Sequence, residues 1–341
     1  MGYAAEKEDA ERRVKKVKRI VCIVLVVLLA GLCIFAAFVP PPSWKYAFRL
    51  PELEKRAEGE LRVHFIDVGQ GDATVIELPD GKIMLVDGGN GTGEATNSLM
   101  RYLNALKVKK IDYLLATHAD TDHCGGLDTV LAYKEVERAF LPFTAPTADS
   151  EYASFYTALK ETGCSYTYSS RRIDLSVTDG ETPYTLAFVY PYAFDAESSD
   201  DLNGADATGG NETSAMVWLD YKGASVLLTG DAPKEVEELL IMEAELGLQG
   251  KFAYDLKSTE ILKVSHHGSS DATSLEFLEH LGVKDAVISC GENNPYSHPH
   301  KETLDALTLA GVKTKRTDQD GSVIVTVHAD GKYEVTALGK E

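Results

Sequence analysis

An uninterrupted apolar stretch near the start is the strongest feature of the hydrophobic pattern. Residues 20–39 carry no charged side chain, and about twenty helical residues span the roughly 30 Å hydrocarbon core of a bilayer. A cleavable signal peptide has only about 7–15 apolar residues before a small-residue cleavage site, whereas this stretch runs into three prolines. We therefore expect an uncleaved transmembrane anchor, with a cleaved signal peptide as the alternative.

Beyond residue 60 the pattern alternates between short apolar runs and amphipathic stretches, as in layered α/β proteins. Residues 61–89 hold three strand-like runs, and Asp80-Gly81 between the second and third is a hairpin signal. The acidic stretch 194–212 lacks periodicity and predicts a long loop. Further strands are expected at 111–118, 216–221, 225–230, 261–265, 286–290, 313–316, 322–328 and 332–337, and helices at 95–107, 126–136, 150–162, 234–246, 273–281 and 300–310.

Charge is distributed unevenly along the chain. The formal net charge is −19, but residues 1–19 carry +3, which leaves −22 on the rest. Basic residues directly before an apolar stretch predict a cytoplasmic N-terminus, with the remainder across the membrane. The acidic remainder argues against a general polyanion-binding surface, which needs clustered Lys and Arg. An anionic substrate is still compatible with it if a metal ion supplies local positive charge.

These features divide the chain into four parts: a cytoplasmic basic tail at 1–19, a transmembrane signal anchor at 20–39, a linker at 40–60 and one large domain at 61–341. The composition, 44% hydrophobic and 26% charged, is that of an ordinary globular protein. Three cysteines lie outside the apolar stretch without a C-x-x-C pair, so we expect them to be buried or idle thiols.

Residues with metal-binding side chains are concentrated in one short segment. His118, Asp120, Asp122 and His123 fall within six residues, directly after an apolar strand. Crowding carboxylates and imidazoles in this way is costly unless a cation compensates the carboxylates. Similar residues follow other apolar runs and are expected at the same sheet edge: Asp231, His266, His267, His298 and His300.

The order of these motifs resembles a known family. FIDVGQGDA, DGG, HADTDHCGGL, TGD, SHHGS, SHPH and RTDQDG together resemble the metallo-β-lactamase-fold domain of the ComEC-type DNA-uptake proteins, over about residues 61–330. The resemblance implies a four-layer αββα sandwich with one or two metal ions at the sheet edge. The polytopic membrane part of the uptake proteins is missing here, so the resemblance does not extend to transport.

The resemblance also implies a ligand set. Asp120 stands where most members have a second His, as is usual in the ComEC-type branch, and Asn211 stands where most have another His. Because an amide is a poor zinc ligand and carboxylates are harder than imidazoles, we expect one or two divalent ions, Zn²⁺ or Mn²⁺. The implied ligands are His118, Asp120, Asp122, His123, Asp231 and His266, with His267 as the alternative to His266.

Other polar residues at this edge receive catalytic or supporting roles. His298 or His300 is placed to supply a proton to a leaving group; the alternative is that the pair forms the N-terminal turn of a helix. The catalytic candidates are Asp122, His298 and His300. The candidates for orienting the ligating imidazoles are Asp67, Asp72, Asp87 and Asp318.

This combination predicts an extracytoplasmic metal-dependent hydrolase that uses a metal-activated water, most favourably a phosphodiesterase or nuclease with a phosphodiester substrate such as DNA. A phosphoester hydrolase of cell-envelope polymers and a non-catalytic metal-binding sensor or interaction module are the alternatives. β-Lactam hydrolysis is disfavoured because Asp120 and Asn211 replace two histidines. The membrane is the one partner indicated, apart from the substrate. For DNA, a positive strip is expected from Lys301, Lys313, Lys315 and Arg316.

Overall fold

The computed structural model describes residues 2–38, 41–146, 150–192, 210–248 and 254–340. Contacts divide the chain into two compact units, Met1–Arg49 and Leu50–Glu341. The first unit holds the long helix α1 (Gly2–Phe38) and the short 3₁₀ turn η1 (Pro41–Tyr46).

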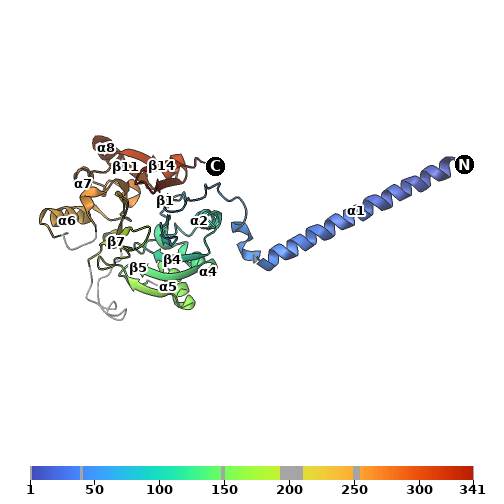
Figure 1. Cartoon of the computed structure of the whole chain (residues 1–341), viewed down its shortest axis with the longest axis horizontal. Coiled ribbons are helices and arrows are strands. Elements are labelled where there is room, and N and C mark those ends of the chain that lie inside the picture. The colour runs from blue at the N-terminus through green and yellow to red at the C-terminus, as the bar shows by residue number, and fades with distance from the viewer. Residues whose placement is uncertain (1, 39–40, 147–149, 193–209, 249–253, 341) are drawn as a thin grey trace. The chain divides into compact units, whose positions relative to one another are not determined.

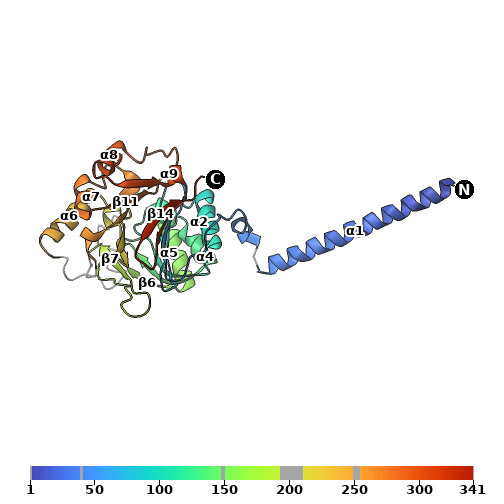
Figure 2. The same cartoon turned by 45° about the horizontal axis from the view of Figure 1, so that its top comes forward.

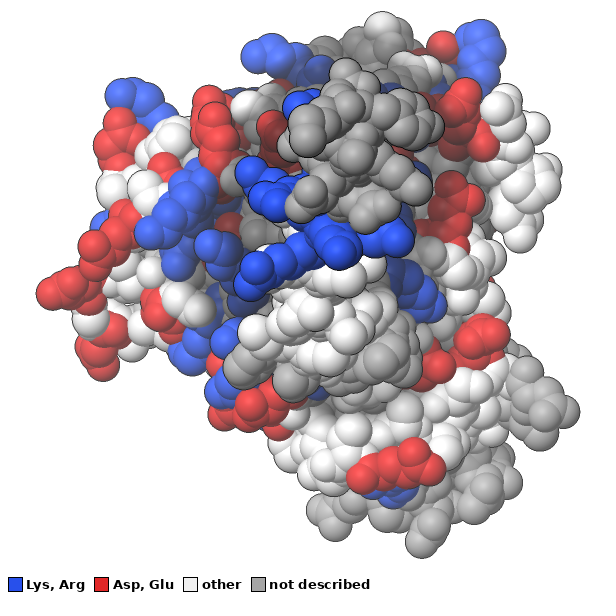
Figure 3. Space-filling model, turned by 90° about the vertical axis from the view of Figure 1, so that its right-hand side faces the viewer, with Lys and Arg blue, Asp and Glu red and all other residues white. Residues whose placement is uncertain are grey.

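Helix α1 contains a segment, Arg12–Ala36, that is long and apolar enough to cross a membrane, and its apolar window is not buried within the protein. Basic side chains precede the apolar part: Arg12, Arg13, Lys15, Lys16, Lys18 and Arg19. Figure 3 looks towards the N-terminal end of α1 and shows Lys and Arg side chains gathered on this part of the helix, beside the white apolar stretch. The helix is therefore consistent with a single-pass membrane anchor.

The second unit is built around two β-sheets (Figure 1). The larger sheet has the spatial order β14 (Tyr333–Ala337), β13 (Val323–Val327), β1 (Leu61–Phe65), β2 (Thr74–Glu77), β3 (Ile83–Val86), β4 (Lys110–Leu115), β5 (Glu135–Leu141) and β6 (Ser165–Tyr168). The smaller sheet has the order β12 (Lys313–Arg316), β11 (Asp285–Ile288), β10 (Ile261–Lys263), β9 (Ala224–Leu228), β8 (Met216–Tyr221) and β7 (Thr185–Tyr190).

Each sheet changes from antiparallel to parallel pairing along its width. In the larger sheet the strands are antiparallel from β14 to β3 and parallel from β3 to β6. In the smaller sheet they are antiparallel from β7 to β9 and parallel from β9 to β12. The carboxyl ends of parallel strands lie at one edge, and this is the edge at which ligands gather in α/β folds.

Helices cover the outer faces of the two sheets. Figures 1 and 2 show α2, α4 and α5 on one side of the sandwich and α6, α7 and α8 on the other. Their bounds are α2 (Gly93–Ala105), α4 (Leu127–Tyr133), α5 (Glu151–Thr162), α6 (Lys234–Glu245), α7 (Leu275–Leu281) and α8 (Lys301–Leu309). Shorter helical turns are α3 (Thr121–Cys124), α9 (Thr317–Asp320), η3 (Asn211–Thr213), η4 (Leu256–Ser258) and η5 (Ser265–Gly268).

Apolar side chains of the described residues form buried clusters between these layers, two of which illustrate the packing. One joins the two sheets and includes Phe65, Phe140 and Phe188. The other lies between the smaller sheet and its helices and includes Leu240 and Phe277. The four-layer αββα sandwich expected from the sequence is thereby confirmed.

Three details differ from the sequence-based expectations. The helix expected at 126–136 ends at Tyr133, because Glu135–Leu141 pairs with β4 as a strand. Strands β6 and β7 were not anticipated; β6 has only four residues and an edge position, which leaves little hydrophobic periodicity. Most of the expected loop 194–212 lies outside the described residues, and its last part is the turn η3.

Candidate metal centre

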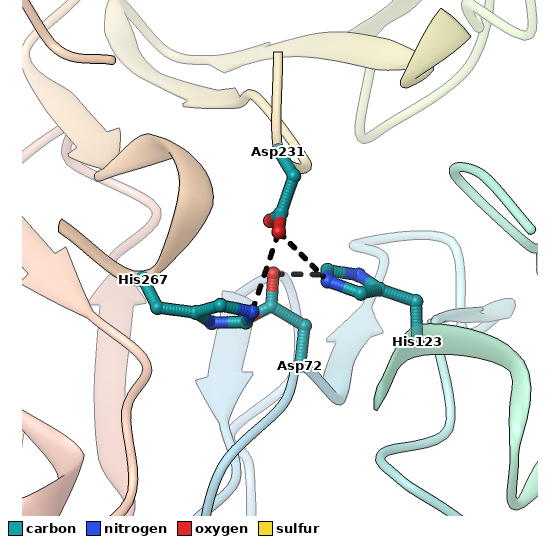
Figure 4. Close-up of side chains that lie close together, drawn as sticks. All are labelled: Asp72, His123, Asp231 and His267. Atoms are coloured by element: carbon teal, nitrogen blue, oxygen red, sulfur yellow. Dashed lines mark ion pairs between the residues drawn. The ribbon is translucent and has the colours of Figure 1, made fainter. Parts of the chain in front are cut away.

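Four buried side chains from separate segments converge at the carboxyl edge of the sheets (Figure 4). Asp72 and His123 belong to the larger-sheet half, where Asp72 lies just before β2 and His123 in α3 after β4. Asp231 follows β9 and His267 lies in η5 after β10, so both belong to the smaller-sheet half. One ligand-type atom from each lies within 4.8 Å of all the others.

The ring of His123 is held in a fixed orientation. Its Nδ1 lies 2.9 Å from Oδ2 of Asp87. The Asp87 carboxylate also accepts hydrogen bonds from Thr117 at 2.8 Å, from the backbone N–H to Oδ1 and from the hydroxyl to Oδ2. Nε2 therefore faces the cluster, 3.2 Å from Oδ2 of Asp231, and has no hydrogen-bond partner among the described residues. This is the arrangement expected of a carboxylate that orients a ligating imidazole.

His267 is oriented in the same manner, by a backbone carbonyl. Its Nδ1 donates to the carbonyl oxygen of Ser289 at 2.9 Å. Its Nε2 then lies 3.1 Å from Oδ2 of Asp122 and 3.3 Å from Oδ2 of Asp231. His266 instead places Nδ1 3.0 Å from Asp271, and its Nε2 is 3.9 Å from Asp231. Of the two neighbouring histidines, the geometry brings His267 into the cluster.

A buried lysine adds a positive charge beside the carboxylates of the centre. Lys263 is buried, pairs with Asp72 and lies 3.5 Å from Oδ1 of Asp231. Burial by itself raises the pKa of Asp72, but Lys263, His267 and His123 outweigh it and lower this pKa to about 2. Burial by itself lowers the pKa of Lys263, but the charges of Asp72 and Asp231 outweigh burial and raise this pKa.

The imidazoles respond to the same carboxylates. Burial lowers the pKa of His267, but Asp231 and Asp72 outweigh it and raise this pKa to about 10. The pKa of His123 is raised as well, by Asp231 and Asp87 against the effect of burial. The centre thus concentrates negative charge that favours cations. Within the described residues, Oδ1 of Asp72, Oδ1 of Asp231 and Nε2 of His123 are buried without a hydrogen-bond partner, and such carboxylate and imidazole atoms are a donor set that fits a divalent ion.

The other predicted ligands lie beside this cluster and do not join it. His118 is buried with its ring 4.1 Å from that of His123, and its Nε2 lies 3.7 Å from the half-exposed carboxylate of Asp120. The amide nitrogen of Asn211 lies 3.3 Å from both ring nitrogens of His266. Their roles as ligands of a second ion stay predictions.

The two catalytic histidine candidates differ in their bonding. Both nitrogens of His300 are used, because Ser270 N donates to Nδ1 at 2.9 Å and Nε2 donates to the carbonyl of Tyr296 at 3.1 Å. The ring of His298 lies 6.1 Å from that of His267, and its buried Nδ1 has no partner among the described residues. Burial, helped by neighbouring histidines, lowers the pKa of His298 to about 4.

Two of the proposed supporting carboxylates are engaged elsewhere. Asp67 pairs with Lys340 at 2.7 Å and accepts from the backbone of Gly69. Asp318 binds the guanidinium of Arg316 through both oxygens, at 3.0 and 2.6 Å. Of the supporting candidates, Asp87 contacts the cluster through His123 and Asp72 belongs to it.

Sequence reasoning missed Lys263. A lysine in the middle of the apolar run ILKV is unusual in a buried strand, and a buried ammonium needs an anionic partner. That single polar position was the available signal, because the partner carboxylates lie far away in the sequence.

Comparisons with known proteins place the chain in a family. Residues 66–292 match the family model described as the metallo-beta-lactamase superfamily. ComE operon protein 3 of Bacillus subtilis is 30% identical over 78% of this chain and 33% of its own length. Recombination protein 2 of Haemophilus influenzae is 28% identical over 79% of this chain and 29% of its own length. Competence protein ComA of Neisseria gonorrhoeae is 27% identical over 78% of this chain and 32% of its own length. The chain thus spans about a third of these relatives. The chain belongs to the metallo-beta-lactamase superfamily, whose members are generally metal-dependent hydrolases, and it is related to the competence proteins.

Proposed function

We propose that the second unit is a phosphodiester hydrolase that depends on a divalent metal ion, with nucleic acid as its favoured substrate. The observation that carries the proposal is the convergence of Asp122, His123, Asp231 and His267 at one sheet edge. The names of the relatives refer to competence and recombination, processes that involve DNA, and this favours a nucleic acid. Because the chain spans a third of those relatives, their whole activity is not transferred to it.

Each residue of the centre has a distinct task in this proposal. His123, His267, Asp231 and Asp122 hold the cation, while Asp87 keeps the ring of His123 turned inward. A divalent ion bound there, Zn²⁺ or Mn²⁺, polarises a phosphoryl group and lowers the pKa of a water molecule. The chain itself supplies the fixed orientation of these groups, of which His123, His267 and Asp231 are buried and Asp122 is partly exposed.

His298 is the better placed of the two histidines for contact with a substrate. Its ring lies beside His267 and its Nδ1 has no partner in the part of the chain that the structure describes, whereas both nitrogens of His300 are bonded within the protein. In the proposal, His298 bonds the phosphoryl or leaving-group oxygen, and His300 holds the loop that carries His298 in place.

We further propose that the domain lies outside the cytoplasm. The basic residues of α1 come directly before its apolar segment, and this order is typical of an anchor whose N-terminus stays inside. Under this proposal residues 1–19 form the cytoplasmic tail, 20–39 the anchor, 40–60 the linker and 61–341 the hydrolase domain.

One observation favours a second substrate, a phosphoester polymer of the cell envelope. Three of the four residues expected to form a positive strip for DNA are paired with acids: Lys301 with Asp305, Lys315 with Asp320, and Arg316 with Asp318. Paired charges leave little net potential to attract a polyanion. An envelope-facing hydrolase needs no such strip when its substrate is anchored nearby.

The metal centre is tested with the full chain in detergent micelles. Hydrolysis of bis(p-nitrophenyl) phosphate, single-stranded and double-stranded DNA, a poly(glycerol phosphate) and nitrocefin is measured with added Mn²⁺ or Zn²⁺. Asp122→Asn is expected to lower phosphodiester hydrolysis roughly 100-fold or more, because it removes a ligand. Asp330→Asn, an exposed carboxylate in the last hairpin turn, is the matched control. Hydrolysis unaffected by Asp122→Asn would reject the assigned centre.

The choice between DNA and an envelope polymer is tested separately. Replacing Lys313, Lys315 and Arg316 by Glu is expected to raise the KM for DNA at low salt while leaving hydrolysis of the small diester unchanged. Added salt should reduce the difference in KM for DNA between the variant and the parent, because exposed charges are screened over about 10 Å at 0.1 M. An unchanged KM for DNA, together with turnover of the glycerol phosphate polymer, would favour the envelope substrate.

A further inference from the structure

Lys263 is a buried lysine inside the metal centre. It is the last residue of β10 and only 2% exposed. Removing an ammonium from water is costly unless acceptors surround it. Here its Nζ donates to the carbonyl oxygen of Gly230 at 2.8 Å, pairs with Asp72 and lies 3.5 Å from Oδ1 of Asp231. Two of these three acceptors belong to the group of four that converges in Figure 4.

The two oxygens of Asp231 have different neighbours. Oδ1 faces Lys263, whereas Oδ2 lies 3.2 Å from Nε2 of His123 and 3.3 Å from Nε2 of His267. Oδ2 of Asp122 lies 3.1 Å from that same nitrogen of His267. Two oxygens and two nitrogens therefore face one another on the side of Asp231 that is turned away from Lys263.

Asp72 lies close to the other nitrogens of these rings. Its carboxylate is 3.5 Å from Nδ1 of His267 and 3.8 Å from Nδ1 of His123. Both Nδ1 atoms are already bonded, one to the carbonyl of Ser289 and the other to Asp87. A ring that binds a cation through Nε2 has its Nδ1 turned away from that cation. Asp72 thus belongs to the group of four, but its carboxylate pairs with the Nδ1 atoms of the two rings, which face away from a cation bound at Nε2.

We propose that Lys263 is a resident cation of the centre, which takes Asp72 as its counter-ion and orients Asp231, so that the metal is held by His123, His267, Asp231 and Asp122 but not by Asp72. The inference rests on the proposed metal centre and is independent of the substrate. Lys263 is a positioning residue in this arrangement, because it acts on the metal through the carboxylate of Asp231.

The proposal has a consequence for the chain without metal. If Lys263 were replaced by an uncharged side chain, Asp72 and Asp231 would be two buried carboxylates without their ammonium. The metal-free fold would lose stability, because breaking a buried ion pair leaves an uncompensated charge. A divalent ion would bind more tightly, because one positive charge beside its site is gone and Asp72 is released.

The ligand assignment is tested on Asp72 first. Binding of Mn²⁺ and Zn²⁺ to the full chain in detergent micelles is measured by titration calorimetry, and bound metal by elemental analysis. Asp72→Asn is expected to keep the parent's metal content per chain, whereas the reference variant His267→Asn loses most of it. Loss of metal from Asp72→Asn equal to that from His267→Asn would overturn the proposal, because Asp72 would then be a ligand.

The role of Lys263 is tested with Lys263→Met, which keeps the length of the side chain. Its metal-free form is expected to unfold at a lower temperature, and its metal affinity to rise by roughly tenfold or more. The double variant Lys263→Met/Asp72→Asn should return both quantities towards the parent values. Unchanged stability and affinity in Lys263→Met would overturn the proposal.

Two further outcomes keep the test decisive. If metal-free Lys263→Met does not fold, the double variant is expected to fold; if neither folds, the metal content of Asp72→Asn decides alone. A parent chain that binds neither ion contradicts the proposed function itself. Metal loss confined to Asp72→Asn contradicts only the assignment of ligands around Lys263.

Discussion

His266 and His267 are adjacent in the chain but have different neighbours, because each has a positive φ, 48° and 53°, that turns the two rings apart. His267→Asn is expected to remove bound metal and to lower hydrolysis roughly 100-fold or more, since its Nε2 lies against Asp122 and Asp231. His266→Asn removes a ring that faces Asp271 and should keep metal in the centre. Metal content and kcat/KM of the two variants check this, and equal metal loss would contradict it.

His64 provides a pH dependence away from the metal centre. The ring is fully buried, with Nδ1 3.0 Å from the Tyr102 hydroxyl and Nε2 3.1 Å from Glu77, and burial lowers its pKa despite Glu77. The folded state therefore binds fewer protons than the unfolded state below the unfolded pKa of about 6.5. Stability should be fully present above that pH and fall towards pH 5, by at most about 1.4 kcal/mol per pH unit.

The uncharged variant His64→Gln checks this pH dependence. Thermal unfolding of the variant and the parent is compared between pH 7 and pH 5, where the carboxylates with lowered pKa values stay ionised. The variant is expected to show a flatter curve than the parent. If the unfolding temperatures of the variant and the parent fell equally over that range, His64 would not be the group responsible for the pH dependence of stability.

The sequence located the site where metal-binding residues are close together in the chain. It did not show which residues face the metal where that depends on side-chain orientation. The segment His118–His123 could be located because metal-binding side chains crowd together after an apolar strand. The choice between His266 and His267 depends on backbone angles that two identical neighbouring residues do not reveal. The pairing of Lys263 with Asp72 joins positions that are far apart in the chain, and no local pattern reports it.

At the scale of elements, the turn between β1 and β2 packs against the metal loop. Asp72 N donates to the carbonyl of Asp122 at 3.0 Å, and a side chain at Gly71, where φ is +133°, would clash with that carbonyl. Gly71→Ala is expected to destabilise the fold by roughly 3 kcal/mol and to weaken metal binding. Gly69→Ala is the matched control, because Gly69 also has a positive φ but open space around it.

Unfolding midpoints and metal affinity of these two variants are the measurement. Gly69→Ala should lose only about 1 kcal/mol, the cost of the left-handed backbone, and should keep its metal affinity. Equal effects of the two substitutions would mean that the close approach to Asp122 has no special role.

The strands and helices that the sequence predicted well are those with several turns or alternations of apolar residues. Helix α5 was expected at 150–162 and occupies Glu151–Thr162, and the Asp80-Gly81 hairpin is present between β2 and β3. The boundary after α4 was misplaced, because the polar residues Glu135 and Glu137 lie in the exposed part of β5 and continue a helical pattern. Tertiary pairing with β4 decides the conformation there.

At the scale of the whole molecule, the proposed orientation can be tested on intact cells. Basic residues precede the apolar segment of α1, so protease added outside is expected to degrade the domain from residue 61 onward while a short N-terminal fragment stays protected. Immunoblotting with tags at the two ends follows both parts, and a cytoplasmic protein serves as the control for lysis. Protection of the entire chain would place the domain in the cytoplasm.

The two sheets contribute equally to the group of four side chains, since Asp72 and His123 come from one half and Asp231 and His267 from the other. An ion held by His123, Asp231 and His267 is therefore a cross-link between the halves of the sandwich. Free metal at 100 times its dissociation constant adds about 2.7 kcal/mol to folding stability. If the domain lies outside the cytoplasm as proposed, it meets external proteases, and metal supply then sets its lifetime. Chelation should shorten the half-life of the protein at the cell surface, and added metal should restore it.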